Sequence, residues 1–284
     1  MATKRVSPKA MRRAGLTNVG ERQYVEEYLQ DVWNRREFAV AVPVGQLRAQ
    51  HMNTLLGNLW HVLNPLMMMG IYYLLFGVIL GTSRGIPHFV AFLAVGVFTF
   101  HYTQRSVSVA SGAVFGNQGL IRAIYFPRSI LPISTVIGQT IAFLPAIVTM
   151  LVVTMLNGVF PRPAWLLLIP LFVVQGIFNL GAAFIVARLG DAYQDFTQIL
   201  PHFFRILIYM SGAMYSVDRF IHSTLTRHLF ELNPMYSFIS LARGAVLGLP
   251  TTYGEYVSVL VWSFALLIAG FIYFRAGEHG YGRG

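Results

Sequence analysis

Six long apolar stretches constrain the fold of this 284-residue chain more than any other feature of its sequence. They lie at about residues 60–81, 88–110, 131–156, 164–187, 197–215 and 256–274. A helix needs about 20 mostly apolar residues to cross a bilayer, and each stretch approaches this length. Hydrophobic residues make up 55% of the chain and charged residues only 11%, whereas soluble domains carry about 25% charged residues. The sequence therefore predicts an all-α membrane protein, a six-transmembrane-helix bundle, rather than a soluble enzyme.

Two of these stretches contain polar interruptions. His101, Gln104 and Arg105 lie near the end of the second stretch, and Arg205 lies inside the fifth. A cation within a span is costly, so we expect Arg205 to face the bundle interior or water. It can contact an anion such as a substrate phosphate, or it can pair with an acid of the preceding turn or with free carbonyl groups. The sequence alone leaves both roles open.

Basic residues predict the orientation of the spans, because cytoplasmic loops carry an excess of Lys and Arg. With the N-terminus inside, the inner segments hold 15 of the 21 basic residues and the outer loops hold five. Both termini are therefore expected in the cytoplasm. The predicted parts are a basic tail at 1–30, a transmembrane domain at 31–275 and a short cytoplasmic tail at 276–284. The basic N-terminus fits a cytoplasmic membrane face better than it fits nucleic-acid binding.

Two more segments are expected at the membrane surface. Apolar residues follow helical spacing over 44–60, which predicts an N-terminal amphipathic interface helix; a cytosolic helix packed on a partner is the alternative. The predicted outer loop 216–255 is half apolar. Within it, Pro234 is expected to open a helix and Gly248 to end one. We interpret this loop as re-entrant extracytoplasmic helices.

The sequence also excludes several kinds of catalytic site. The chain has no cysteine, and its two lysines, Lys4 and Lys9, lie in the basic tail. A P-loop needs a lysine directly after its glycines to reach the nucleotide phosphates, so this chain cannot itself be a P-loop ATPase. Its histidines are scattered without ligand spacing, and no acid falls clearly inside a span. We therefore expect no catalytic residue, no metal site and no cofactor in this chain.

Three ordered motifs over residues 30–275 resemble the membrane permeases of ABC exporters for polysaccharides. The first motif comprises Gly57, Trp60, Asn64, Pro65, Phe76 and Gly77. The second comprises Asn117, Leu120, Ile121, Phe126, Pro127, Arg128, Leu131 and Pro132. The third comprises Asn233, Pro234 and Arg243. The turn after the fourth stretch departs from the family, which often has Arg-Asp where this chain has Gln194-Asp195.

The resemblance implies a multi-pass homodimer in the bacterial cytoplasmic membrane that works with two copies of a separate cytosolic ATPase. ATP and Mg would bind to that partner. The implied activity is export of a polyprenyl-linked glycan through surrounding membrane lipid. The long basic N-terminus and the preference for Arg over Lys are most similar to the permeases of mycobacterial galactan exporters.

We also predict three kinds of site. A short element ending near Pro127 would couple the chain to the ATPase, through Gly119, Leu120, Ile121, Arg122, Tyr125, Phe126, Pro127 and Arg128. The substrate channel would be lined by the first and fifth spans, through Tyr72, Phe76, Phe203, Phe204, Arg205 and Tyr209. Aromatic rings suit this role because they stack on sugars without holding one tightly. Asn233, Pro234 and a buried Arg243 would form an extracytoplasmic gate.

Two other functions remain as alternatives. The same architecture can serve an ABC permease for drugs or small lipids. A membrane-embedded transferase acting on a polyprenyl lipid is a third hypothesis, although such enzymes commonly need clustered acids that hold a metal.

Overall fold

The computed structural model describes residues 25–37, 39–41, 43, 57–81, 83, 85–124, 126–217, 230 and 232–281. Residues 1–24 of the predicted tail and 44–56 of the predicted interface helix lie outside these residues. The same holds for Tyr125 and for most of 218–231. The regular structure of the described residues is entirely helical.

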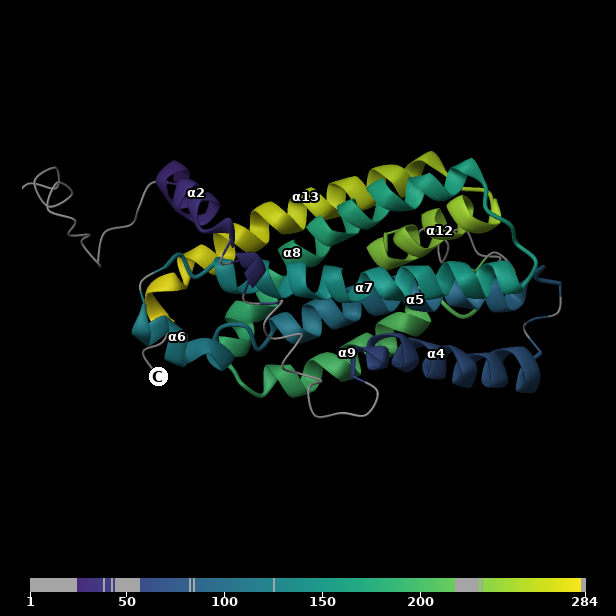
Figure 1. The fold of residues 1–284 in the computed structure, drawn as a ribbon, viewed down its shortest axis with the longest axis horizontal. Coiled ribbons are helices and arrows are strands. Elements are labelled where there is room, and N and C mark those ends of the chain that lie inside the picture. Colours follow the sequence, from purple (N-terminus) through teal and green to yellow (C-terminus); the bar gives the residue numbers. More distant parts are fainter. Residues whose placement is uncertain are drawn as a thin grey trace, which may run out of the picture.

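Long helices lie roughly along one axis, with shorter helices at the ends (Figure 1). The α-helices are α2 (Val25–Asn34), α4 (Trp60–Tyr72), α5 (Phe89–Ala110), α6 (Gln118–Ala123), α7 (Ile130–Leu156), α8 (Leu168–Ala192), α9 (Phe196–Met210), α12 (Pro234–Leu247) and α13 (Tyr253–Ala276). A π-helix, η2 (Tyr73–Ile79), continues α4. The 3-10 helices are η1 (Gly57–Leu59), η3 (Phe115–Asn117), η4 (Pro163–Leu167) and η5 (Glu278–Gly280).

Each predicted span coincides with a helix, but the helices differ in their fitness to cross a membrane. Four segments are long and apolar enough: Val62–Ile79, Ile130–Leu156, Pro163–Ala192 and Tyr253–Ala276. Helix α5 has 22 residues but carries the polar group around Arg105. Helix α9 has only 15 residues, fewer than the 20 or so that a full crossing needs. The six-span count therefore remains a prediction.

Helix α9 ends at Met210 rather than at the expected residue 215. The backbone turns at Gly212, whose φ of +60° favours glycine. Residues 211–215 are apolar or only weakly polar, so their hydropathy does not indicate that the helix ends before them.

The most extensive helix packing is that of α8 against α13, followed by that of α5 against α7. A Cβ atom at Gly181 of α8 would collide with the backbone of Leu266 and Leu267 in α13. Small residues allow such close approach of helices in membranes. The fold therefore uses glycine to bring these two helices into backbone contact.

A row of buried polar side chains joins α5 to α8. Thr103 Oγ1 donates a 2.7 Å hydrogen bond to Asn179 Oδ1. Gln175 Nε2 donates to the Thr99 carbonyl and to Thr103 Oγ1, both at 2.9 Å. Gln175 and Asn179 are four residues apart, so they project from one face of α8.

The two ends of the bundle have different contents. Helices α2 and α6 lie at one end of the bundle, together with the C-terminal end of α13 (Figure 1). The α7–α8 connection and α12 lie toward the opposite end; Arg162 of that connection donates a 2.8 Å hydrogen bond to the Val246 carbonyl of α12. Which end faces the cytoplasm remains a prediction from the basic residues.

Candidate functional site

The predicted coupling segment forms a short helix, α6, at the end of the bundle that also holds α2 (Figure 1). Gly119, Arg122 and Ile124 are exposed, and Ile124 leaves 45% of its surface uncovered. Leu120 and Ile121 are partly buried and pack on a core cluster formed with Phe126. The helix is thus attached along one side and open on the other.

The base of α6 is fixed more firmly than its tip. Phe126 is 4% exposed and Pro127 is buried. The Arg128 backbone N–H donates a 2.9 Å hydrogen bond to Glu278 Oε1, and its guanidinium donates to the Glu278 carbonyl. Within the predicted coupling set, these residues therefore anchor the segment, whereas Gly119 and Arg122 present its surface.

Tyr28 extends this anchor to helix α2. Its hydroxyl donates a 2.9 Å hydrogen bond to Glu278 Oε1 and accepts one of 3.2 Å from the Ser129 N–H. Burial raises the pKa of the Tyr28 hydroxyl, and the Glu278 carboxylate raises it further. The hydroxyl therefore remains a donor at neutral pH. Sequence reasoning missed Tyr28 and Glu278, because residues about 250 positions apart carry no sequence signal of pairing.

Helices α4 and α9 expose many large apolar side chains. We call these side chains the α4–α9 surface: Met67, Ile71, Leu74 and Val78 on α4 and η2, and Ile199, Phe203, Ile206 and Met210 on α9. Each of them is at least 49% exposed in the single chain. In Figure 1 these helices lie along the edge opposite α13. Exposed apolar surface of this extent requires cover by lipid or by protein.

The structure brings together part of the predicted channel lining. The rings of Phe76 and Tyr209 lie 6.4 Å apart. Tyr72 and Phe76 are partly buried, whereas Phe203 and Tyr209 are 54% and 42% exposed. The first and fifth predicted spans thus meet through aromatic side chains.

Phe204 occupies a different position from its neighbour Phe203. It is 3% exposed and contacts Phe100 edge to face, at 6.1 Å between centroids. With Leu200 and Ile208 it forms the buried stripe of α9, because residues four apart share a helix face. Phe204 therefore belongs to the core of the single chain rather than to its outer surface.

Arg205 is exposed on the outside of the single chain rather than in its interior. Neither Asp191 nor Asp195 forms an ion pair with it in the described part of the chain. Asp195 lies at the N-cap of α9 without a capping side-chain hydrogen bond. The ion pair with these acids that we considered for Arg205 is therefore not formed, and contact with an anion or with free carbonyl groups stays a prediction.

The third predicted group surrounds α12. Its boundaries confirm the prediction: the Asn233 side chain caps the N-terminus by accepting from the Met235 N–H at 3.0 Å, Pro234 is the first residue, and Gly248 ends the helix with φ +74°. Arg243 is 6% exposed, as expected. Insertion of this helix into the bilayer remains a prediction.

Arg243 acts as a clamp between three segments. Its guanidinium donates to the carbonyls of Phe92 at 3.2 Å, Gly212 at 2.9 Å and Ala213 at 2.6 Å. Its Cζ lies 3.4 Å from the centroid of the Phe92 ring, a cation–π contact. The arginine thus holds α12, α5 and the end of α9 together.

Among the described residues, no group of three or more His, Asp or Glu side chains could hold a metal ion.

Comparison with known proteins places the chain in a family. Residues 45–247 match the ABC-2 type transporter family. An O-antigen export system permease protein RfbA of Klebsiella pneumoniae is 26% identical over 232 residues, 81% of this chain and 88% of that protein. The protein of that name from Myxococcus xanthus is 26% identical over 212 residues, covering 75% and 81%. The polysialic acid transport protein KpsM of Escherichia coli is 27% identical over 224 residues, covering 76% and 83%. Because the family match spans well over half of the chain and contains helices α4 to α12, this protein belongs to the ABC-2 type transporter family.

Proposed function

We propose that this chain is the membrane subunit of an ATP-driven exporter that moves a lipid-linked polysaccharide across the bacterial cytoplasmic membrane. The observation that carries the proposal is the family match over residues 45–247, joined to relatives named for O-antigen export and polysialic acid transport. Those relatives are similar to this chain over most of their length.

The proposed engine is a separate cytosolic ATPase, present in two copies on a homodimer of this chain. The geometry of α6 supports this arrangement. Its base is held by Phe126 and by the hydrogen bonds from Arg128 to Glu278, while Ile124 and Arg122 remain at the surface. A force on the exposed side of α6 would pass through this base into α7.

The proposed path lies between two copies of the chain, along the α4–α9 surface. This surface combines exposed apolar residues with Phe203 and Tyr209, next to the cation Arg205. Ring faces give a sliding polymer many weak and similar contacts. A guanidinium forms the stronger charge-assisted contacts to phosphate oxygens.

Galactan is the substrate that we propose. Support for it comes from the long basic N-terminus and the preference for Arg, with 19 Arg and two Lys among 21 basic residues.

The function can be tested in membranes that contain this chain, its ATPase and a radiolabelled lipid-linked galactan. Arg122→Asp and Ile124→Asp place a negative charge at exposed positions of the proposed contact, where an unpaired charge is costly. Both should abolish ATP-dependent export and weaken co-purification of the ATPase. Phe160→Asp is the control, because Phe160 is 72% exposed at the opposite end of the bundle.

Export of galactan by the unmodified complex, lost in both α6 variants and kept in Phe160→Asp, would support the proposal. Transport of small lipids or drugs but of no glycan would replace it with the other permease function. Normal export by a variant that carries both substitutions would show that α6 does not couple the chain to the ATPase.

A further inference from the structure

Helix α5 carries a guanidinium that no described residue neutralises. Arg105 is partly buried, and none of the described residues forms a hydrogen bond or an ion pair with its side chain. Ionised groups within membrane helices are costly and generally pair with other groups or line a cavity. Arg105 therefore requires an anion, water or a segment outside the described residues.

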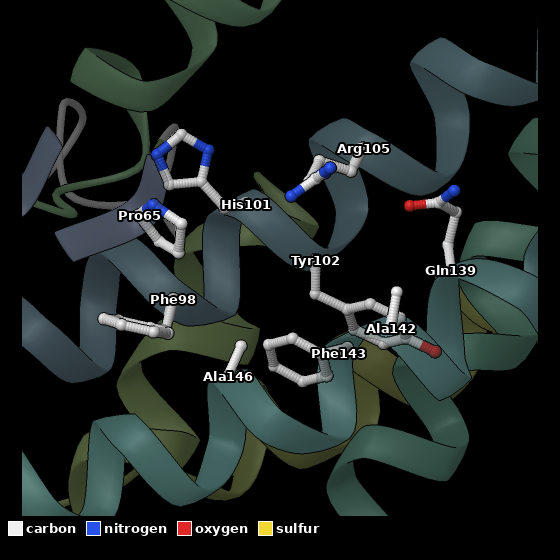
Figure 2. Close-up of a pocket in the computed structure, with 9 residues that line it drawn as sticks. All are labelled: Pro65, Phe98, His101, Tyr102, Arg105, Gln139, Ala142, Phe143 and Ala146. Atoms are coloured by element: carbon white, nitrogen blue, oxygen red, sulfur yellow. The ribbon is translucent and has the colours of Figure 1, made fainter. Parts of the chain in front are cut away.

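A cavity lies directly beside this cation, between α4, α5 and α7 (Figure 2). It contains about 330 Å³ of empty space, including its open mouth. The space that a small group can occupy inside it is only about 30 Å³, roughly that of one or two water molecules. A phosphate would therefore enter from the open mouth, and a sugar polymer is excluded.

The two ends of the cavity differ in polarity. Figure 2 places Arg105 and Gln139 toward one end and Phe98 and Ala146 toward the other. These positions follow from the antiparallel helices, since Arg105 and Phe98 are seven residues apart on α5, about 10 Å at 1.5 Å per residue. The cavity therefore offers a polar end and an apolar end to one ligand.

The polar groups of the cavity favour an anion. His101 Nε2 is buried without a hydrogen-bond partner among the described residues. Gln139 is 8% exposed and adds a side-chain amide at the same end as Arg105. No aspartate or glutamate lines the cavity, so no carboxylate competes for the guanidinium.

The depth of the cavity matches that of a lipid headgroup. Arg105 lies five residues before Ala110, the last residue of α5, which is about 7–8 Å along the axis. That end of α5 leads to α6, the end predicted to face the cytoplasm. The polar end of the cavity would then lie near the headgroup region, and its apolar end would point toward the hydrocarbon core.

We propose that this cavity binds the phosphate of a membrane-anchored lipid at Arg105, and that the lipid is the polyprenyl phosphate carrier of the exported glycan. The inference rests on the proposed function, and it assigns to α5 and α7 the recognition of the carrier before the glycan reaches the α4–α9 surface. Arg105 supplies the charge and the planar fork of donors that suits phosphate oxygens. Gln139 and His101 supply further donors, and the apolar end accommodates the first carbons of the lipid chain.

The test is binding of defined lipids to the complex of this chain with its ATPase, in nanodiscs, followed by native mass spectrometry. The probes are a long-chain polyprenyl phosphate and phosphatidylglycerol. Polyprenyl phosphate should bind the unmodified complex at least tenfold more tightly than phosphatidylglycerol. Arg105→Gln should weaken its binding by about ten- to a hundredfold, the range expected for losing a charge-assisted contact.

Two further variants keep the test decisive if Arg105→Gln assembles poorly. Ala142→Phe fills the cavity from α7 while leaving the cation in place, and it should also weaken binding by at least tenfold. Arg105→Lys keeps the charge and should lose less. Arg36→Gln is the control, since it removes one positive charge from an exposed position that follows α2, and its affinity should stay within twofold.

Each outcome decides the inference. Unchanged affinity in both Arg105→Gln and Ala142→Phe would overturn it. Equal affinity for the two lipids, reduced alike in the variants, would assign the cavity to ordinary phospholipid and overturn the carrier role. Glycan export by the unmodified complex is measured in parallel, so that loss of this inference is distinguishable from failure of the proposed function.

Discussion

Helices α8 and α4 have similar hydropathy but opposite surroundings. Their most apolar windows have mean hydropathies of 2.0 and 1.8, yet 50% of the α8 window is buried inside the chain and only 6% of the α4 window. Helix α8 packs on α13 through Gly181, whereas Gly70 of α4 has no atom within 4 Å of the position that a Cβ would take. Hydropathy therefore identifies both segments as membrane helices. It does not show that α8 packs inside the chain, whereas the surface of α4 is left for lipid or for a second copy of the chain.

The largest loss of stability is expected when the Arg243 clamp is removed. Arg243→Met would leave three carbonyl oxygens, of Phe92, Gly212 and Ala213, without their donor. Loss of charge-assisted bonds and desolvated acceptors should lower the free energy of unfolding by about 3–5 kcal/mol. Thermal unfolding of the purified protein in detergent measures this loss. A midpoint equal to that of Arg36→Gln would show that the clamp does not stabilise the fold.

The second prediction compares the stability of variants at the two glycines, Gly181 and Gly70. Gly181→Ala should destabilise the protein by about 2 kcal/mol, because the new methyl meets the α13 backbone and the helices must separate. Gly70→Ala should be neutral or stabilising by up to about 1 kcal/mol, since Ala favours the helix and finds open space. The same unfolding assay measures both variants. Equal midpoints would contradict the contrast between α8 and α4.

A smaller loss of stability is expected when the row of buried polar side chains between α5 and α8 is disrupted. Asn179→Leu removes the 2.7 Å hydrogen bond from Thr103, and interhelical hydrogen bonds in membrane proteins contribute about 0.6 kcal/mol on average, up to about 1.7. We expect a loss of about 1 kcal/mol. Thr149→Val is the control, since Thr149 bonds only the Pro145 carbonyl of its own helix. A larger loss of stability in Thr149→Val than in Asn179→Leu would show that the polar row does not stabilise the fold.

The smallest effect on stability is expected on the α4–α9 surface. Phe203→Ala should change the unfolding free energy of the single chain by less than about 0.5 kcal/mol, because the ring is 54% exposed. It should nevertheless weaken self-association and slow export. Sedimentation in detergent reports the dimer, and a stability loss like that of a core phenylalanine would show that Phe203 is covered within the chain.

Most of the helices could be predicted from the sequence, because apolar length is a local property. The first stretch, 60–81, is the continuous segment Trp60–Ile79, and the third, 131–156, is Ile130–Leu156. The π-helical turn in η2 and the early end of α9 at Gly212 could not be predicted in this way. Both depend on backbone geometry, which hydropathy does not report.

The candidate sites were predictable only in part. Helical phase separates Phe203 from Phe204 but does not reveal which of the two faces the core; that depends on Phe100, a partner from another helix. The link from Arg128 to Glu278 and the cavity beside Arg105 arise from segments far apart in the sequence. The polar group around Arg105 was visible only as an interruption of the second span.

The central claim is that the α4–α9 surface faces a second copy of the chain, and single-cysteine cross-linking in membranes tests it most directly. The chain has no cysteine, so Ile206→Cys and Ile268→Cys give a clean pair. Ile206 on α9 is 62% exposed and Ile268 on α13 is 60% exposed, so exposure in the single chain does not separate them. The account predicts that a short bifunctional reagent joins two copies efficiently at position 206 and hardly at all at position 268. Cross-linking at 268 but not at 206 would contradict it.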